Sequence, residues 1–143
     1  GRKAGAAAQD PSSFFMALAG PTIVTHATDD QKRRFLRPMF TGAERWCQLF
    51  SEPSGGSDVA GARTRAERTP DGSGDWIING QKVWTTGAQF SDFGIVICRT
   101  NPDVAKHKGL TMFIVPLKAD GVTVQPVVVT PYSSSKAPGS GSL

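Results

Sequence analysis

The sequence predicts an α+β domain in which N-terminal helices precede a small antiparallel β-barrel or sandwich. Two observations lead to this fold class. Apolar residues recur at helical spacing up to about Gly42, and the rest of the chain alternates short apolar segments with turn-forming residues. A chain of 143 residues with 38% hydrophobic residues is also long enough to bury a core without disulfides or metal ions.

Two helices are expected before Gly42. The first would bury a face made of four apolar residues: Phe14, Phe15, Leu18 and Ala19. Gly20 and Pro21 would interrupt or kink this helix. The second helix has a clear start, because Thr28 and Gln31 form a T-x-x-Q capping box, and Gly42 would end it.

Six or so short strands are expected in the rest of the chain, drawn from residues 46–51, 62–69, 76–78, 81–86, 93–99, 110–117 and 122–129. Asn79-Gly80 is the usual sequence of a type I′ turn, which predicts a hairpin between residues 76–78 and 81–86. Alternation in the second segment places Ala62, Thr64 and Ala66 on one face, opposite three charged residues.

Composition disfavours several classes of protein. The net charge of +4 comes from basic residues spread along the chain, which is unlike a nucleic-acid-binding surface. No apolar stretch approaches the about 20 residues that cross a bilayer, so no membrane segment is expected. Cys47 and Cys98 lie in apolar runs typical of buried thiols, and the two histidines offer no zinc-binding spacing. A reducing, cytoplasmic location is therefore expected.

Two segments are candidates for a binding site. In the Gly-rich residues 52–58 (EPSGGSD), backbone N–H groups can approach an anion or a flat ring, and Ser57 adds a hydroxyl. This stretch matches neither a GxGxxG motif nor a phosphate-binding loop, so on its own a plain turn is the simpler interpretation. In residues 81–86, a strand would place Trp84 and Thr86 on one face, where they could hold an aromatic cofactor. The simpler alternative puts Trp84 in the core.

Two catalytic constellations are conceivable but disfavoured. Cys47 could pair with His26 or His107 as a nucleophile, but no charged neighbour in the sequence would lower its pKa. Glu52 and Asp58 could serve as an acid and a base, although carboxylates on a loop more often cap it.

Residues 46–60 (WCQLFSEPSGGSDVA) and residues 77–86 (IINGQKVWTT) decide between these interpretations when they are taken together. Their order and spacing resemble the signature of the flavin-dependent acyl-CoA dehydrogenase family. Residues 28–36 are similar to the helix that precedes the β-domain of this family, and residues 109–115 are similar to a later strand. The resemblance extends from about Phe14 to Pro126.

This resemblance implies the middle β-domain of such an enzyme, with flavin adenine dinucleotide (FAD) as the cofactor. The flavin-contacting positions of the family fall on seven residues: Gln48, Leu49, Phe50, Ser51, Trp84, Thr85 and Thr86. Ser57 takes the place near the thioester of the acyl-CoA substrate. The family removes an α-proton with a carboxylate base and passes the β-hydride to flavin N5, which yields a 2-enoyl-CoA. Electron-transfer flavoprotein would be the acceptor, and the enzyme would be a homo-oligomer, either a tetramer or a dimer.

The same resemblance implies a division of the chain. Residues 1–44 would end an N-terminal helical domain, residues 45–130 would form the middle β-domain, and residues 131–143 would be a linker-like tail. The C-terminal helical domain, which carries the catalytic carboxylate in most members, would be absent. No catalytic residue is therefore expected here, and the chain alone should be inactive. An acyl-CoA oxidase and a non-catalytic flavin- or acyl-CoA-binding module are the alternatives, and a nucleic-acid-binding β-barrel is a weaker one.

Overall fold

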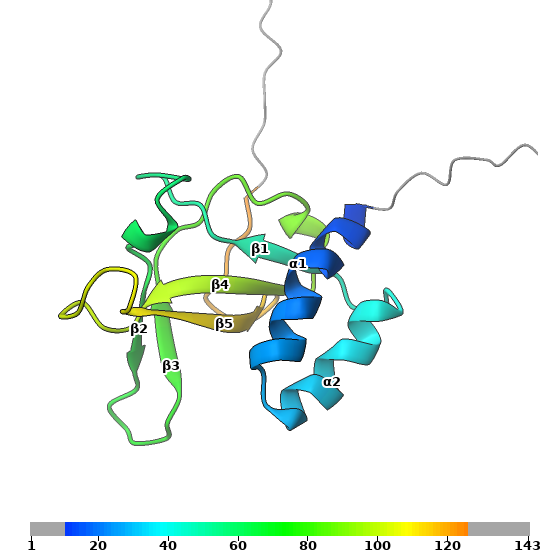
Figure 1. The fold of residues 1–143 in the computed structure, drawn as a ribbon, viewed down its shortest axis with the longest axis horizontal. Helices are drawn as coiled ribbons and strands as arrows, with labels where there is room; N and C mark the ends of the chain where they lie inside the picture. The colour runs from blue at the N-terminus through cyan, green and yellow to red at the C-terminus, as the bar shows by residue number, and fades with distance from the viewer. Residues whose placement is uncertain (1–10, 126–143) are drawn as a thin grey trace, which may run out of the picture.

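The computed structural model of the chain describes residues 11–125, with side chains from residue 17 onward. Two α-helices, α1 (Pro11–His26) and α2 (Asp29–Phe40), precede five strands and two short 3₁₀ helices. These elements are β1 (Trp46–Leu49), η1 (Val59–Gly61), β2 (Arg65–Arg68), β3 (Trp76–Asn79), η2 (Ala88–Phe90), β4 (Phe93–Arg99) and β5 (Leu110–Pro116). The helices lie together beside β1, and the β2–β3 hairpin projects from the opposite end of the sheet (Figure 1). Within residues 11–125, no helix combines the length and apolar character needed to cross a membrane.

Helix α1 runs through Gly20 and Pro21 without the predicted interruption. Gly20 is buried, and a Cβ atom at this position would lie 3.2 Å from Cζ of Phe40, so the glycine allows the two helices to approach closely. This packing stabilises the helix where the local sequence disfavours it. The predicted buried face is also wrong in part, because Leu18 is 37% exposed whereas Ala19 is buried. The side chains of Phe14 and Phe15 lie outside the described residues.

The capping box of α2 is confirmed. The backbone N–H of Gln31 donates to Oγ1 of Thr28 at 3.3 Å, and the N–H of Thr28 donates to Oε1 of Gln31 at 2.9 Å. The helix ends at Phe40, and Gly42 follows with a φ of +72°, a conformation that glycine adopts at no steric cost. Both ends of this helix therefore follow from its local sequence.

The sheet is mixed and open, which corrects the expected antiparallel barrel or sandwich. Strand β5 pairs with β4 in antiparallel fashion along its whole length. On the other edge of β4, β1 pairs in parallel at its start, and β2 pairs in parallel at Arg99. Strands β2 and β3 form an antiparallel hairpin, and β4 and β5 are a second antiparallel pair of consecutive strands joined by a longer connection. The alternation of a sequence shows which residues share a face but not the direction of the neighbouring strand, so the parallel pairs were not predictable from it.

The hairpin predicted at Asn79-Gly80 is also wrong. Strand β3 pairs with β2 across residues 70–74, and residues 81–86 form no strand. Neither Asn79 nor Gly80 has the positive φ that a type I′ turn requires. Gly80 is needed for a different reason, because a Cβ atom there would lie 2.7 Å from Cα of Thr64. The chain crosses Thr64 at this point instead of reversing.

The expected strand at residues 122–129 is not found over residues 122–125, which have no regular structure. Residues 126–129 and the expected linker at 131–143 lie outside the described part of the chain.

The alternation before and within β2 is confirmed, because Ala62, Thr64 and Ala66 are all buried.

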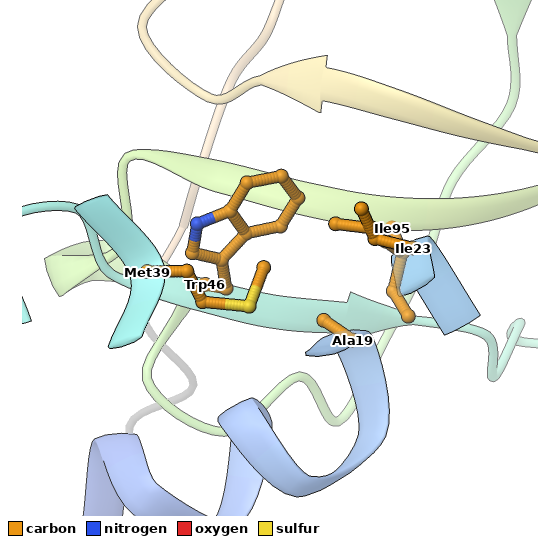
Figure 2. Close-up of a cluster of buried hydrophobic side chains, with 5 residues drawn as sticks. All are labelled: Ala19, Ile23, Met39, Trp46 and Ile95. Carbon is orange, nitrogen blue, oxygen red and sulfur yellow. The ribbon is translucent and has the colours of Figure 1, made fainter. Parts of the chain in front are cut away.

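The core lies on both faces of β4. On the helical side, Trp46 and Ile95 from the sheet pack against Ala19 and Ile23 of α1 and Met39 of α2, as Figure 2 shows. On the other face, Val96 and Cys98 pack with Ala66 of β2. Adjacent residues of β4 thus contribute to different clusters, as the pleat of a strand requires. This core holds β1 and β4 in place, and the candidate site is built on the loop that follows β1.

Gly80→Ala should destabilise the chain by about 2 kcal/mol, because the added methyl group meets the Thr64 backbone in a packed region. Urea denaturation measures this change. Gly55→Ala is the matched control, since a Cβ atom at Gly55 has no neighbour within 4 Å, and the free energy of unfolding should change by less than about 0.5 kcal/mol. Equal effects of the two substitutions would contradict the proposed close crossing.

Candidate functional site

The Gly-rich segment belongs to a loop, residues 50–64, that leaves the sheet between β1 and β2. Strand β1 stays beside β4 as far as the pairing of Leu49 with Val96, and β2 rejoins at the pairing of Arg65 with Arg99. The two ends of the loop therefore lie close together along one edge of β4. Glu52 joins them, because its carboxylate accepts hydrogen bonds from the backbone N–H groups of Arg63 at 2.7 Å and Thr64 at 2.9 Å.

Glu52 also forms a buried ion pair. Its Oε1 lies 2.8 Å from Nζ of Lys82, and the side chains of Lys82 and Glu52 are only 7% and 6% exposed. Burial alone would raise the pKa of Glu52, but the hydrogen bonds from Lys82, Thr64 and Arg63 outweigh it and lower the pKa to about 2. The Glu52 carboxylate is therefore ionised at neutral pH and hydrogen-bonded to Lys82, Arg63 and Thr64.

The second predicted segment lies directly beside the first. The N–H of Val83 donates to the carbonyl of Ser51 at 2.9 Å, and Nζ of Lys82 donates to the carbonyl of Phe50 at 3.2 Å. The structure thus brings together the two segments that carry the predicted flavin-contacting residues. It does so without the strand expected at residues 81–86.

Trp84 is 74% exposed, so the alternative that put it in the core is wrong. It is also the one residue other than glycine in the described chain with a positive φ, +58°, which is strained for a bulky side chain. Next to it, Oγ1 of Thr85 is buried and has no hydrogen-bond partner among the described residues. Thr86 is exposed. The segment therefore carries an exposed indole next to a buried hydroxyl group that has no partner among the described residues.

The other predicted cofactor residues are half-buried at the end of β1. Phe50 packs against the cluster around Trp46, and Leu49 packs against the cluster on the opposite face. Ser51 lies next to the Gly-rich segment, because a Cβ atom at Gly56 would be 3.5 Å from Oγ of Ser51. The remaining residue, Gln48, is in the strand itself, paired with Ile95.

Ser57 is exposed in the second half of the Gly-rich segment. Beside it, Asp58 accepts a hydrogen bond from the N–H of Gly61 at 3.1 Å and pairs with Lys106 at 2.7 Å. An open pocket of about 220 Å³ adjoins this segment, with Phe50, Gly55, Asp58 and Arg63 among its lining residues. Ser57 itself does not line this pocket.

Arg99 supports the far side of the same loop. Its guanidinium donates to the carbonyl oxygens of Ala60 at 2.5 Å and Ala62 at 3.4 Å, and also to that of Lys106 at 2.6 Å. Sequence analysis missed Arg99 and the Glu52–Lys82 pair. Glu52 and Lys82 are thirty residues apart, and no local pattern links positions at that distance.

The alternative catalytic constellations find no support in the geometry. Burial raises the pKa of the Cys47 thiol to about 11, despite a hydrogen bond with Ser91 that lowers it, and His26 and His107 are both exposed. Glu52 and Asp58 have separate lysine partners, and the hydrogen bond from Lys106 lowers the pKa of Asp58. Within residues 11–125, no group of three His, Cys, Asp or Glu side chains is arranged to hold a metal ion.

Comparison with known proteins places these features in a family. Residues 47–136 match the family model described as "Acyl-CoA dehydrogenase, middle domain". The chain is 45% identical over 109 residues to acyl-CoA dehydrogenase FadE34 of Mycobacterium tuberculosis, a match that covers 76% of this chain. The chain belongs to the acyl-CoA dehydrogenase family.

Solved structures of the family have the same fold. The chain superposes on a steroid acyl-CoA dehydrogenase, Tcur3481-Tcur3483, with a TM-score of 0.69 and 36% identity over 75% of this chain. It superposes on a glutaryl-CoA dehydrogenase from Mycobacterium smegmatis in complex with FADH2 with a TM-score of 0.68 and 31% identity over 78% of this chain. The matches span only 15% of FadE34 and 28% and 27% of the two solved chains.

The Glu52 carboxylate should make stability depend on pH in acid solution. Because its pKa in the folded chain is about 2, below the ordinary 4.5, ionised Glu52 stabilises the fold fully above about pH 4.5. This contribution is lost progressively as the pH falls from 4.5 toward 2. Denaturation of the wild type and Glu52→Gln across this range should show the stability difference shrinking as the pH falls. A difference that is constant across the range would contradict the assignment.

Proposed function

We propose that this chain forms one side of the FAD and acyl-CoA site of an enzyme that dehydrogenates acyl-CoA thioesters to 2-enoyl-CoA. One observation carries the proposal. The exposed Trp84 is held beside Ser51 at the end of β1 by the hydrogen bond that the neighbouring Val83 donates to Ser51. These are the same two segments in which the family resemblance places the flavin contacts.

The residues present fit an isoalloxazine ring. A flavin has a flat apolar face, which the indole of Trp84 can cover, and a polar edge that accepts and donates hydrogen bonds. An exposed bulky indole on a strained backbone is costly unless a ligand covers it. We assign the flavin contacts to seven residues: Gln48, Leu49, Phe50, Ser51, Trp84, Thr85 and Thr86.

The cofactor, when bound, would accept the hydride that leaves the β-carbon of the substrate. The residues of this chain act by binding and orientation. We assign Ser51 and Thr86 to hydrogen bonds with the polar edge of the ring, Trp84 to one of its faces, which it would shield from water, and Ser57 to the acyl-CoA. None of the described carboxylates near the site is assigned as the base, because Glu52 and Asp58 are both held in ion pairs.

Names of the related proteins support the proposal and suggest substrates. One solved relative is a complex with FADH2, and another is described as a steroid acyl-CoA dehydrogenase. We therefore propose assays with a straight-chain acyl-CoA and with a thioester of a steroid side chain. Transfer of electrons to electron-transfer flavoprotein, and assembly as a dimer or tetramer, belong to the same proposal through the family resemblance.

Titration with FAD tests the proposal directly. Trp84→Ala should raise the dissociation constant for FAD by about tenfold, because the flavin loses an aromatic face. Phe40→Ala, which removes another exposed aromatic side chain, from helix α2, should leave the FAD affinity unchanged. Equal affinity of the wild type and Trp84→Ala for FAD, or no binding by the wild type, would refute the proposed site.

The reaction class has its own test. Because this chain alone is expected to be inactive, the assay uses an enzyme that contains it, incubated with each acyl-CoA and an artificial electron acceptor, and 2-enoyl-CoA is measured. Product formation would support the dehydrogenase, and hydrogen peroxide formed in air without that acceptor would indicate an acyl-CoA oxidase. FAD binding without product would instead favour a non-catalytic flavin- or acyl-CoA-binding module.

A further inference from the structure

The buried Glu52–Lys82 ion pair joins the two segments that face the proposed flavin site. Glu52 follows Ser51 directly, and Lys82 lies two residues before Trp84. The distance from Oε1 of Glu52 to Nζ of Lys82 is 2.8 Å, and both side chains are almost completely removed from solvent. The ion pair therefore links a residue next to Ser51 with a residue close to Trp84 in the chain.

Each charged group makes more than one contact. Nζ of Lys82 donates both to Glu52 and to the carbonyl of Phe50, so it binds the side chain and the backbone of the first segment at once. The Glu52 carboxylate in turn accepts the N–H groups of Arg63 and Thr64. One ion pair therefore connects the end of β1, the end of loop 50–64 and the start of residues 81–86, which we call the Trp84 segment.

The stability of the fold does not by itself explain why Glu52 and Lys82 are buried as an ion pair. Burying two charges costs desolvation free energy, and well-packed apolar side chains of similar size often stabilise a fold equally well or better. Unlike apolar packing, the pair fixes the distance and the relative orientation of the two segments, because hydrogen bonds between charged groups require a defined geometry. The strained backbone of Trp84 lies two residues from this anchor and must be held against relaxation.

We propose that Glu52 and Lys82 are positioning residues that hold Trp84 and Thr85 against Ser51 in the geometry that receives the flavin. The inference rests on the proposed function, because the flavin gives this geometry its purpose. The positioning itself concerns only residues of this chain. It can therefore be measured without any cofactor, at the N–H of Val83 that donates to Ser51.

The test compares the single variants Glu52→Gln and Lys82→Met with the double variant Glu52→Gln/Lys82→Met. Each single change leaves one buried charge without its partner, so both should lower the midpoint of thermal unfolding. The double variant removes both charges and should recover most of the loss. Lys118→Met is the control, since it breaks an exposed ion pair of 2.7 Å with Asp92 and should change nothing.

Two readouts separate positioning from stability in the full chain. Hydrogen exchange of the Val83 amide, followed by NMR, should be about tenfold faster in the double variant than in the wild type although thermal stability is recovered. Titration with FAD should show about a tenfold weaker affinity in the same variant.

Wild-type exchange of the Val83 amide in the stable double variant would overturn the proposal. A double variant that fails to fold would also overturn it, because the pair would then be required for folding and not for placement. Failure of the wild type to bind FAD would refute the proposed function instead, and the exchange of Val83 would still decide whether the pair positions this segment.

Discussion

Strand β4 uses both of its edges, and the rest of the fold follows from that constraint. Its backbone is buried, so every N–H and C=O group along it needs a partner. Strand β5 occupies one edge from Phe93 to Arg99. The other edge is shared in succession by β1 and by the start of β2. The chain between β1 and β2 must therefore leave the sheet and return to the same edge, and this excursion is the loop that carries the Gly-rich segment.

The two ends of such a loop must be held together, and here the Glu52 carboxylate holds them. Glu52 binds the N–H groups of Arg63 and Thr64 where the loop returns, and the carbonyl of Thr64 then accepts the N–H of Arg99 at 2.6 Å. A buried carboxylate needs a cation nearby, and Lys82 supplies it. Glu52 therefore joins the two ends of the loop and, through Lys82, also contacts the segment that carries Trp84.

The helices contribute by fixing where β1 begins. Phe35 of α2 meets Trp46 and Phe93 edge to face, with ring centroids 5.4 and 5.3 Å apart, and Trp46 stacks on Phe93 at 5.1 Å. Asp92 accepts the N–H of Arg45 through its carboxylate at 3.0 Å and donates its own N–H to the Arg45 carbonyl at 2.8 Å. The start of β1 is therefore held by aromatic packing and by two hydrogen bonds between Arg45 and Asp92, and Ser51 follows its other end.

The sequence by itself determined the features that depend on near neighbours: the capping box of α2, the stop at Gly42, the alternation from Ala62 to Ala66 and the burial of both cysteines. Two long motifs in order also sufficed for the family. Only the tertiary structure decided the parallel pairing of β1, the passage of α1 through Pro21, the partner of Glu52 and the exposure of Trp84. Helix caps and side-chain alternation arise from contacts within a few residues. The other features arise where distant segments meet, as when the Gly80 backbone crosses Thr64, and there packing and the need to pair buried polar groups outweigh local preference.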